Sequence, residues 1–436
     1  MKFYSTKDKS VFYSLEEAVL KSLPDDNGLF MPEQFPLLPE EFFKNISALS
    51  FQDIASEVSR KFLTGDMPED VIDTIARESV NFPVPLKQLE ANTAILELFH
   101  GPTLAFKDVG ARFMARVMAW LNRDKEDKLT ILVATSGDTG SAVANGFYQV
   151  EGIDVIILYP SGKVSELQEK QLTTLGSNIT AIEVSGSFDD CQRMVKTAFL
   201  DKSLRNLYRL SSANSINIAR LLPQSFYYMD AYRQTDGRPD IVFSIPSGNF
   251  GNLTAGLFAK RMGLPVRHFI ASTNVNDSVV RYLENGKFEA RETTATISNA
   301  MDVGNPSNFV RMLDLFNNSC PEMNKEITAF SFNDRETREA MKKVFLEKSY
   351  TLDPHGAVAY LGWKKFEEEN KENFYGIVLE TAHPAKFIDV VEETLKTEVS
   401  LPEALSVLRN KEKKAVKMDT EYLHFQEFLK DRARTS

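Results

Sequence analysis

The sequence is poor in the residues that build disulfide frameworks and structural metal sites. Of its 436 residues, two are cysteines and five are histidines. Cys191 and Cys320 belong to no Cys-x-x-Cys pair and to no Cys/His spacing that suits zinc. We therefore expect no metal ion and no disulfide framework. A reducing compartment, with the cytoplasm as the simplest choice, is the expected location.

The sequence also lacks an excess of basic residues and a long apolar run. Lysine and arginine number 51 against 61 aspartates and glutamates, which gives a formal net charge of −10. Nucleic-acid binding depends on neutralising phosphates, so we expect no nucleic-acid partner. No uninterrupted apolar run approaches membrane-spanning length, and the N-terminus shows no apolar signal core, so we expect no membrane partner. An anionic substrate would require positive charges gathered in one pocket.

The length allows two or three domains with a large buried core. The first ninety residues read mainly as helices. Ser14 and Glu17 have the spacing of a capping box, and residues 50–63 and 68–79 are amphipathic. We expect a mostly helical region over residues 1–90.

From residue 129, short apolar segments alternate with helical patterns. One series spans residues 129–200, a second spans residues 207–285, and a late apolar strand is expected at 374–379. Strands that alternate with helices form parallel sheets with helices on both faces. The sequence therefore predicts an α/β protein. Residues 286–333, rich in Asn, Ser, Thr and Pro, follow neither pattern.

One lysine stands where a turn gives way to a helical pattern. Residues 100–108 read His-Gly-Pro-Thr-Leu-Ala-Phe-Lys-Asp, and the Gly-Pro pair breaks any preceding strand. A helix is expected from Asp108. Lys107 should then lie beside backbone N–H groups and Phe106, surroundings that favour the neutral amine that Schiff-base chemistry requires. The alternative interpretation, a surface lysine at a helix start, is not excluded by this stretch alone.

Two turns rich in small residues follow expected strands and open expected helices. They read Ala-Thr-Ser-Gly-Asp-Thr-Gly-Ser-Ala over 134–142 and Pro-Ser-Gly-Asn-Phe-Gly-Asn-Leu-Thr over 246–254. Backbone N–H groups and the helix dipole gather anions at such turns. Neither turn has the Walker A or the GxGxxG spacing, which disfavours a nucleotide-binding protein. Two such turns together with Lys107 indicate a phosphate-bearing cofactor at the carboxyl ends of the strands.

Two further segments contain polar residues near strand ends. In residues 211–220, Asn214 and Ser215 are expected to cap a helix that includes Arg220, and taken alone this is an ordinary cap with an exposed arginine. Thr381 follows the late strand and can point into the same cleft. His383 and His355 are interpreted as structural turn residues.

With these segments assembled, the sequence resembles the threonine synthase family, pyridoxal-phosphate enzymes of the tryptophan-synthase-β-like (fold type II) group. The resemblance runs over nearly the whole chain. It is carried by segments 4–6, 16–20, 26–32, 99–108, 136–140, 247–252 and 380–384. It implies two parallel-sheet α/β domains with the cofactor in the cleft between them. We expect the large domain at 91–127 and 235–400, the smaller one at 128–234, and a helical tail at 401–436.

The resemblance implies roles for the residues that would hold pyridoxal 5′-phosphate. Lys107 would bind the cofactor as a Schiff base and then serve as acid and base, and Thr381 would hydrogen-bond the pyridine nitrogen. The cofactor phosphate would lie in a cradle formed by Gly248, Asn249, Phe250, Gly251 and Asn252. Asp138, where the fold group usually has asparagine, would lie beside the cofactor's 3′-oxygen. A carboxylate against a phenolate is repulsive, so we expect the two to share a proton.

The resemblance also implies a substrate site. Ser136 and Thr139 would bind the substrate carboxylate. The substrate phosphate would be bound by Asn214, Ser215 and Arg220.

The implied activity is that of a carbon–oxygen lyase acting on phosphates. It converts O-phospho-L-homoserine and water to L-threonine and phosphate, with one domain closing on the other to exclude water. One alternative is a phospho-lyase acting on O-phosphohomoserine or phosphothreonine and releasing a 2-oxo acid, ammonia and phosphate. A non-catalytic binding protein on the same fold is an alternative from a different class. The expected assembly is a monomer or a homodimer.

Overall fold

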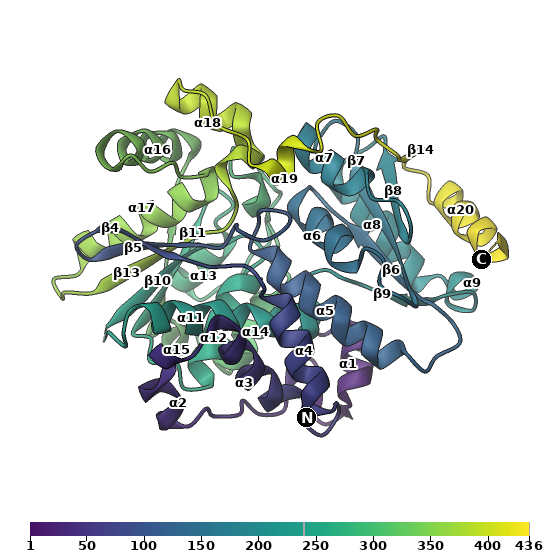
Figure 1. Cartoon of the computed structure of the whole chain (residues 1–436), viewed down its shortest axis with the longest axis horizontal. Helices are drawn as coiled ribbons and strands as arrows, with labels where there is room; N and C mark the ends of the chain where they lie inside the picture. Colours follow the sequence, from purple (N-terminus) through teal and green to yellow (C-terminus); the bar gives the residue numbers. More distant parts are fainter. Residues whose placement is uncertain (239, 436) are drawn as a thin grey trace.

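The computed structural model describes residues 1–238 and 240–435 and contains three sheets (Figure 1). The largest has the order β12-β11-β10-β13-β5-β4 and is parallel except for β4, which pairs antiparallel with β5. Its strands are β4 (Leu86–Glu90), β5 (Thr93–Glu97), β10 (Ile241–Pro246), β11 (His268–Thr273), β12 (Ile327–Ser331) and β13 (Tyr375–Glu380).

The second sheet is entirely parallel, with the order β14-β8-β7-β6-β9. Its strands are β6 (Leu129–Ala134), β7 (Ile153–Pro160), β8 (Ile179–Val184), β9 (Arg209–Ser211) and β14 (Val416–Met418). The two parallel sheets agree with the α/β architecture that the alternating pattern predicts.

Both faces of the largest sheet are covered, as its apolar strands require. Neighbouring residues of a strand point to opposite faces. Val242 packs in the core beneath α17 (Pro354–Glu369), whereas Ile241 and Phe243 pack in the core on the other face. Figure 1 shows α17 on one side of this sheet and α11 (Ser225–Gln234) and α12 (Gly251–Arg261) on the other.

Helices follow the strands of both parallel sheets, as the alternating pattern predicts, and short helices that the pattern does not predict lie among them. Around the second sheet they are α6 (Asp138–Phe147), α7 (Glu166–Thr173), α8 (Phe188–Leu200) and α9 (Lys202–Arg205). Around the largest sheet they are α13 (Ser278–Asn285), α14 (Phe309–Leu315), α15 (Cys320–Asn324), α16 (Asp334–Lys348), α18 (Ile388–Leu395) and α19 (Glu403–Ser406). Short 3-10 turns are η1 (Ile46–Ala48), η2 (Leu222–Gln224), η3 (Asn299–Met301) and η4 (Pro384–Phe387). The helix α5 (Lys107–Asn122) lies between the two halves of the molecule and packs on α6 and on α10 (Ile218–Leu221).

The first ninety residues contain more strand than the sequence indicated. Four helices are present: α1 (Leu15–Lys21), α2 (Glu40–Lys44), α3 (Phe51–Leu63) and α4 (Glu69–Ser79). The capping box of Ser14 and Glu17 begins α1 as expected. A third, antiparallel sheet is formed by β1 (Phe3–Ser5), β2 (Phe12–Tyr13) and β3 (Phe30–Pro32). Strands of two or three residues are too short for a periodicity of two to be visible in the sequence.

The sequence pattern over residues 215–233 predicts one helix, but in the structure this segment is broken. It forms α10, the 3-10 turn η2 and α11, with Pro223 in the turn. Proline lacks the N–H that a continuous helix needs. Tyr228 of α11 packs edge-on against Phe243 and Phe269 of the largest sheet. The end of segment 128–234 therefore packs with the large domain.

The tail after residue 401 is also less uniform than expected. β14 extends the second sheet beside β8, and α20 (Tyr422–Thr435) buries Phe425 and Leu429 against α8. We propose that the two domains follow the two parallel sheets, with α11 in the large domain and β14 and α20 in the small one. Among residues 1–238 and 240–435, no helix is long and apolar enough to cross a membrane.

Candidate active site

A cavity of about 110 Å³ lies where the carboxyl ends of strands from both parallel sheets meet. Ligands of open α/β sheets bind at such ends. Ten of the site residues expected from the sequence line this cavity: Lys107, Thr139, Ser215, Arg220, Gly248, Asn249, Phe250, Gly251, Asn252 and Thr381. Residues separated by more than 270 positions in the chain thus converge on one space. Ser136, Asp138 and Asn214 do not line it.

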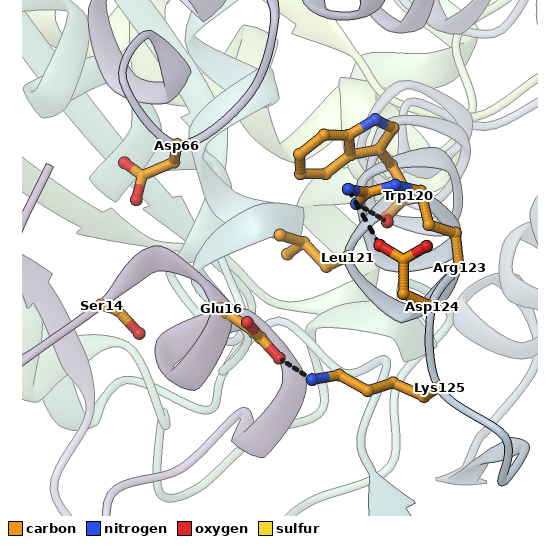
Figure 2. A pocket seen from close by; sticks show the side chains of 8 residues that line it. All are labelled: Ser14, Glu16, Asp66, Trp120, Leu121, Arg123, Asp124 and Lys125. Carbon is orange, nitrogen blue, oxygen red and sulfur yellow. Dashed lines mark hydrogen bonds and ion pairs between the residues drawn. The ribbon is translucent and has the colours of Figure 1, made fainter.

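A second cavity, of about 280 Å³, lies near the start of α1 and the end of α5 (Figure 2). Its charged side chains are already paired: Lys125 lies 3.0 Å from Glu16, and Arg123 lies 3.0 Å from Asp124. The Arg123 guanidinium also stacks on the Trp120 ring at 3.7 Å. None of the residues selected from the sequence lies there, so the smaller cavity is the candidate active site.

Lys107 is the first residue of α5, and its loop is fixed to the end of β13. The Phe106 N–H donates to the Thr381 carbonyl at 2.9 Å, and the His383 N–H donates to the Leu104 carbonyl at 3.0 Å. Leu104 has a positive φ of 58°, which few non-glycine residues adopt. The Lys107 ammonium group lies 5.6 Å from the centre of the Phe106 ring. These contacts orient the lysine into the cavity.

The surroundings of Lys107 favour its neutral form, as the sequence predicted. Burial lowers the pKa of Lys107 to about 8, with Asp138 opposing the shift and the cations Arg220 and Lys386 adding to it. The Lys107 Nζ atom lies 3.8 Å from Asp138 Oδ2. A buried amine with a lowered pKa is the state needed for attack on a carbonyl group.

The turn from β10 to α12 has the form of an anion cradle. Phe250, the residue before α12, has a positive φ of 59°. Within the described part of the chain, the N–H groups of Gly248, Asn249 and Phe250 donate to no other atom. A Cβ atom at Gly248 would lie 2.6 Å from Met301 Cα, so the turn has no room for a side chain there. Free N–H groups at a helix start match the needs of a phosphate.

Asn252 adds a side-chain donor to this cradle. Its Oδ1 atom accepts hydrogen bonds from the hydroxyls of Tyr227 at 2.6 Å and Tyr228 at 2.7 Å. Its Nδ2 atom is buried and has no partner among the described residues. A buried donor without an acceptor is costly, so this atom fits a bound phosphate oxygen. The residues present therefore fit a phosphate-bearing cofactor.

Arg220 is a buried cation in the same cavity. Its side chain is 3% exposed, and within the described residues no carboxylate lies within ion-pair distance of it. Its guanidinium donates to the Ala213 carbonyl. Burial lowers the pKa of Arg220 to about 10. The interpretation of this segment taken alone, with an exposed arginine, is therefore wrong. Asp108 attracts Arg220 from beyond ion-pair distance, and a buried cation with no carboxylate in contact among the described residues fits a site that binds an anion.

The expected cap on Arg220's helix is also corrected. Asn217, not Asn214 or Ser215, caps α10, since its Oδ1 atom accepts the Ala219 N–H at 2.9 Å. Ser215 lines the cavity, and its hydroxyl accepts a hydrogen bond from Asn308 Nδ2 at 3.1 Å. The Asn214 Oδ1 atom is buried and unpartnered among the described residues.

Asp138 begins α6 beside Lys107, and its carboxylate is held by cations. Lys386 Nζ lies 2.7 Å from Asp138 Oδ1, and Gln168 Nε2 donates to the same oxygen at 2.8 Å. Burial alone would raise the pKa of Asp138, but Lys386, Lys107 and these hydrogen bonds outweigh it and hold the pKa well below its usual range. The proton expected to be shared between Asp138 and the cofactor's 3′-oxygen stays a prediction, and the structure adds Lys386 and Lys107 as two amines that stabilise the carboxylate.

Several residues near the site were not selected from the sequence. His355 lines the cavity, with Nδ1 2.6 Å from Asp353 Oδ2 and Nε2 accepting the Ala300 N–H at 3.1 Å. Arg311 is fully buried and donates to the carbonyls of Phe30 and of Ser215 and Ile216, which fixes the Ser215 loop. No local pattern marks these residues, because their partners come from other elements. His383 is structural as expected, since its ring accepts the Ala385 N–H.

The whole chain is similar to known proteins. The family model described as "Pyridoxal-phosphate dependent enzyme" matches residues 82–378. The models described as "Threonine synthase N terminus" and "Threonine synthase, C-terminal" match residues 2–80 and 356–429. The threonine synthase of Escherichia coli is 44% identical over 408 residues, which cover 93% of this chain and 94% of the relative. That of Buchnera aphidicola subsp. Acyrthosiphon pisum is 45% identical with the same coverage.

Solved structures agree with these matches. The crystal structure of threonine synthase from Escherichia coli aligns with a TM-score of 0.91 and 40% identity, covering 99% of this chain and 100% of that one. The structure of pyridoxal-phosphate-bound threonine synthase from Brucella melitensis aligns with a TM-score of 0.92 and 34% identity over both whole chains. The fold type and the cofactor expected from the sequence are thereby confirmed. The chain belongs to the threonine synthase family of pyridoxal-phosphate-dependent enzymes.

Proposed function

We propose that the protein converts O-phospho-L-homoserine and water to L-threonine and phosphate. The observation that carries this proposal is the buried Arg220, which lacks a carboxylate partner among the described residues and lies in the same cavity as Lys107. The cradle at residues 248–252 accounts for one phosphate, that of the cofactor. Arg220 and Ser215 lie apart from that cradle in sequence and offer donors for a second phosphate, which a phosphorylated amino acid supplies.

Lys107 is proposed to hold the cofactor covalently and to move protons on the substrate. Pyridoxal phosphate, when bound, supplies an electron sink for negative charge at the substrate's Cα atom. Lys107 would take the proton from Cα and hand it to the bound cofactor, and the neutral amine would then take a second proton from Cβ on the same face. That second proton would pass to Cγ once phosphate has left, and Cα would be reprotonated after water adds at Cβ. Arg220 binds the phosphate at Cγ and stabilises its charge as the bond to carbon breaks.

The remaining residues are proposed to orient the reactants. Thr139 and Ser136, at the start of α6, bind the substrate carboxylate. Thr381 lines the cavity, and its hydroxyl would hydrogen-bond the pyridine nitrogen of the bound cofactor. Closure of the small domain holds water out until phosphate has left.

The products decide between this activity and its nearest alternative. The purified protein with pyridoxal phosphate and O-phospho-L-homoserine should release phosphate and threonine in equal amounts. Release of a 2-oxo acid and ammonia in place of threonine would instead establish a phospho-lyase. A protein that binds no cofactor would be a non-catalytic relative.

We also propose that the enzyme works in the cytoplasm as a monomer or a homodimer. Cys191 and Cys320 are both free thiols, which suits a reducing compartment. Light scattering of the purified protein measures its mass directly, and a value near one or two chains is expected.

The rate of cofactor uptake is expected to rise with pH. The neutral amine of Lys107 is the attacking group, and its pKa of about 8 places half of it in that form near pH 8. The uptake rate of the cofactor-free protein, followed by visible absorbance, should therefore rise from about pH 7 to pH 9 and then level off. A midpoint near 10.5, the ordinary lysine value, would contradict the proposed surroundings.

The glycine at the cradle is expected to be intolerant of a side chain. In Gly248→Ala the new Cβ would meet the backbone of Met301 at 2.6 Å, so the turn or the segment 299–301 must shift. We expect cofactor affinity to fall at least about tenfold, which corresponds to about 1.4 kcal/mol. Equilibrium titration measures this. Gly251→Ala is the matched comparison, because its Cβ would meet the movable Asn308 side chain at 3.3 Å, and its effect should be smaller.

A further inference from the structure

Lys386 is a buried lysine that the reaction as proposed does not use. Its side chain has no exposed surface, and it lies in the 3-10 turn η4 that follows β13. Its Nζ atom lies 2.7 Å from Asp138 Oδ1 and donates to the Thr103 carbonyl at 2.8 Å. A buried ammonium group is rarely kept unless its charge is needed and its donors are satisfied.

The contacts of Lys386 join the two domains beside the cavity. Lys386 and Thr103 belong to the large domain, whereas Asp138 begins α6 of the small one. Two glutamines of α7 complete the contact: Gln168 Nε2 donates to Asp138 Oδ1 at 2.8 Å, and Gln171 Nε2 donates to the Thr103 carbonyl at 3.2 Å. The Asp138 carboxylate and the Thr103 carbonyl oxygen therefore each accept hydrogen bonds from both domains.

The charge of Lys386 also balances the charges around Lys107. The charged groups that act on Lys107 are Asp138 from α6, Arg220 from α10 and Lys386 from η4. Asp138 attracts a proton to Lys107, whereas Lys386 and Arg220 repel one. Lys386 in turn is surrounded by Asp138, by Lys107, by the buried Asp108 and by His383. Without Lys386, the Asp138 carboxylate would be balanced by Lys107 alone.

We propose that Lys386 is a positioning residue that holds the Asp138 carboxylate ionised and fixed in direction beside Lys107, and that it thereby fastens the small domain to the large one. The pair leaves Lys107 free to act as a neutral amine while a carboxylate stands 3.8 Å away. The inference rests on the proposed function of Lys107 as the residue that binds the cofactor. It assigns no contact between Lys386 and substrate or cofactor.

The test compares four variants of the full chain: Lys386→Met, Lys386→Arg, Asp138→Asn and the double variant Lys386→Met/Asp138→Asn. The first readout is the pH midpoint of cofactor uptake by the cofactor-free protein. Lys386→Met should move the midpoint up by about one pH unit, and Asp138→Asn should move it down, as nearby charges do. The double variant should return it close to the original value. Lys386→Arg keeps the charge and should keep the midpoint within a few tenths of the original.

The second readout is the thermal midpoint of the cofactor-free protein. Removing one partner of a buried ion pair leaves the other uncompensated, whereas removing both is much less costly. Lys386→Met should therefore melt several degrees lower than the unchanged protein, and the double variant should recover most of that loss. This comparison remains informative if Lys386→Met folds poorly, because the double variant removes both charges and should carry a smaller cost than either single variant.

The outcomes that overturn the inference are specific. Single variants that move the midpoint of uptake in the same direction, or not at all, would make Lys386 merely structural. A double variant that is no more stable than Lys386→Met would show that the two side chains do not act as a pair. Failure of the proposed function is recognised separately, since a Lys107→Ala protein would then still form the visible cofactor band.

Discussion

Replacing Lys107 by alanine is expected to abolish both the visible cofactor band and the turnover of O-phospho-L-homoserine. Lys107 is the lysine that lines the cavity together with the cradle at 248–252, and its pKa of about 8 leaves a far larger fraction of neutral amine than an ordinary lysine has. The variant loses the group that attaches the cofactor and the base that moves two protons. Since one positioned base alone contributes about 10²–10⁴-fold, the loss should exceed about 10³-fold. Absorbance and phosphate release measure the two effects.

A matched lysine distinguishes this effect from a general loss of charge. Lys128 precedes β6, is 60% exposed and lies 3.8 Å from Asp154. Exposed pairs of this kind contribute little to stability, so Lys128→Ala should keep the band and the turnover. A Lys107→Ala protein that retained a tenth of the original turnover would contradict the assignment of Lys107.

Replacing Arg220 by methionine is expected to separate binding of the substrate phosphate from binding of the cofactor. Methionine fills similar apolar space but cannot pair with a phosphate. Losing a charged donor aimed at developing negative charge costs about 10²–10³-fold, so kcat/KM for O-phospho-L-homoserine should fall by that amount. Cofactor binding should persist, because the cradle at 248–252 is built from a different turn. A kcat/KM that falls less than about threefold would remove Arg220 from the site.

The stability of the Arg220→Met protein is expected to move in the opposite direction. Arg220 is a buried cation without a carboxylate partner among the described residues, so its charge destabilises the cofactor-free fold. The thermal midpoint should stay the same or rise, as happens when a residue kept for function is replaced. Arg311→Met is the contrasting control. Arg311 is equally buried but donates to carbonyls of Phe30, Ser215 and Ile216, and its loss should lower the midpoint by several degrees.

The order of elements could be predicted from the sequence because it depends on local pattern. The alternating series predicted over residues 129–200 is present as β6, β7 and β8, each followed by a helix. The capping box at Ser14 and Glu17 is equally local. Side-chain periodicity and caps involve residues within a few positions of one another, so one sequence is enough to recognise them. Strands of two or three residues, such as β1 and β14, carry too little pattern and were missed.

The site residues that could be predicted are those in motifs whose residue types and spacing are typical of one chemical role. The turn at 246–254 and the lysine at a helix start are recognisable because phosphate cradles and amine nucleophiles need particular residues at particular spacings. The sequence by itself, through motifs in a specific order, therefore determined the family, the fold type and the cofactor.

Only the tertiary structure decided which charged side chains are buried and which lie next to one another. The segment around Arg220, taken alone, indicates an exposed helix residue, and only the family resemblance implied that it binds the substrate phosphate. The packing of α10 against α5 buries it beside the cavity. Nothing near Asp138 in the sequence indicates an ion-pair partner, whereas the fold places Lys386, 248 residues later in the chain, 2.7 Å from it. Electrostatic energies depend on distance and burial, and both are set by elements far apart in sequence. The identity of a charged residue can be read from its own position, but its ionisation and its partner cannot.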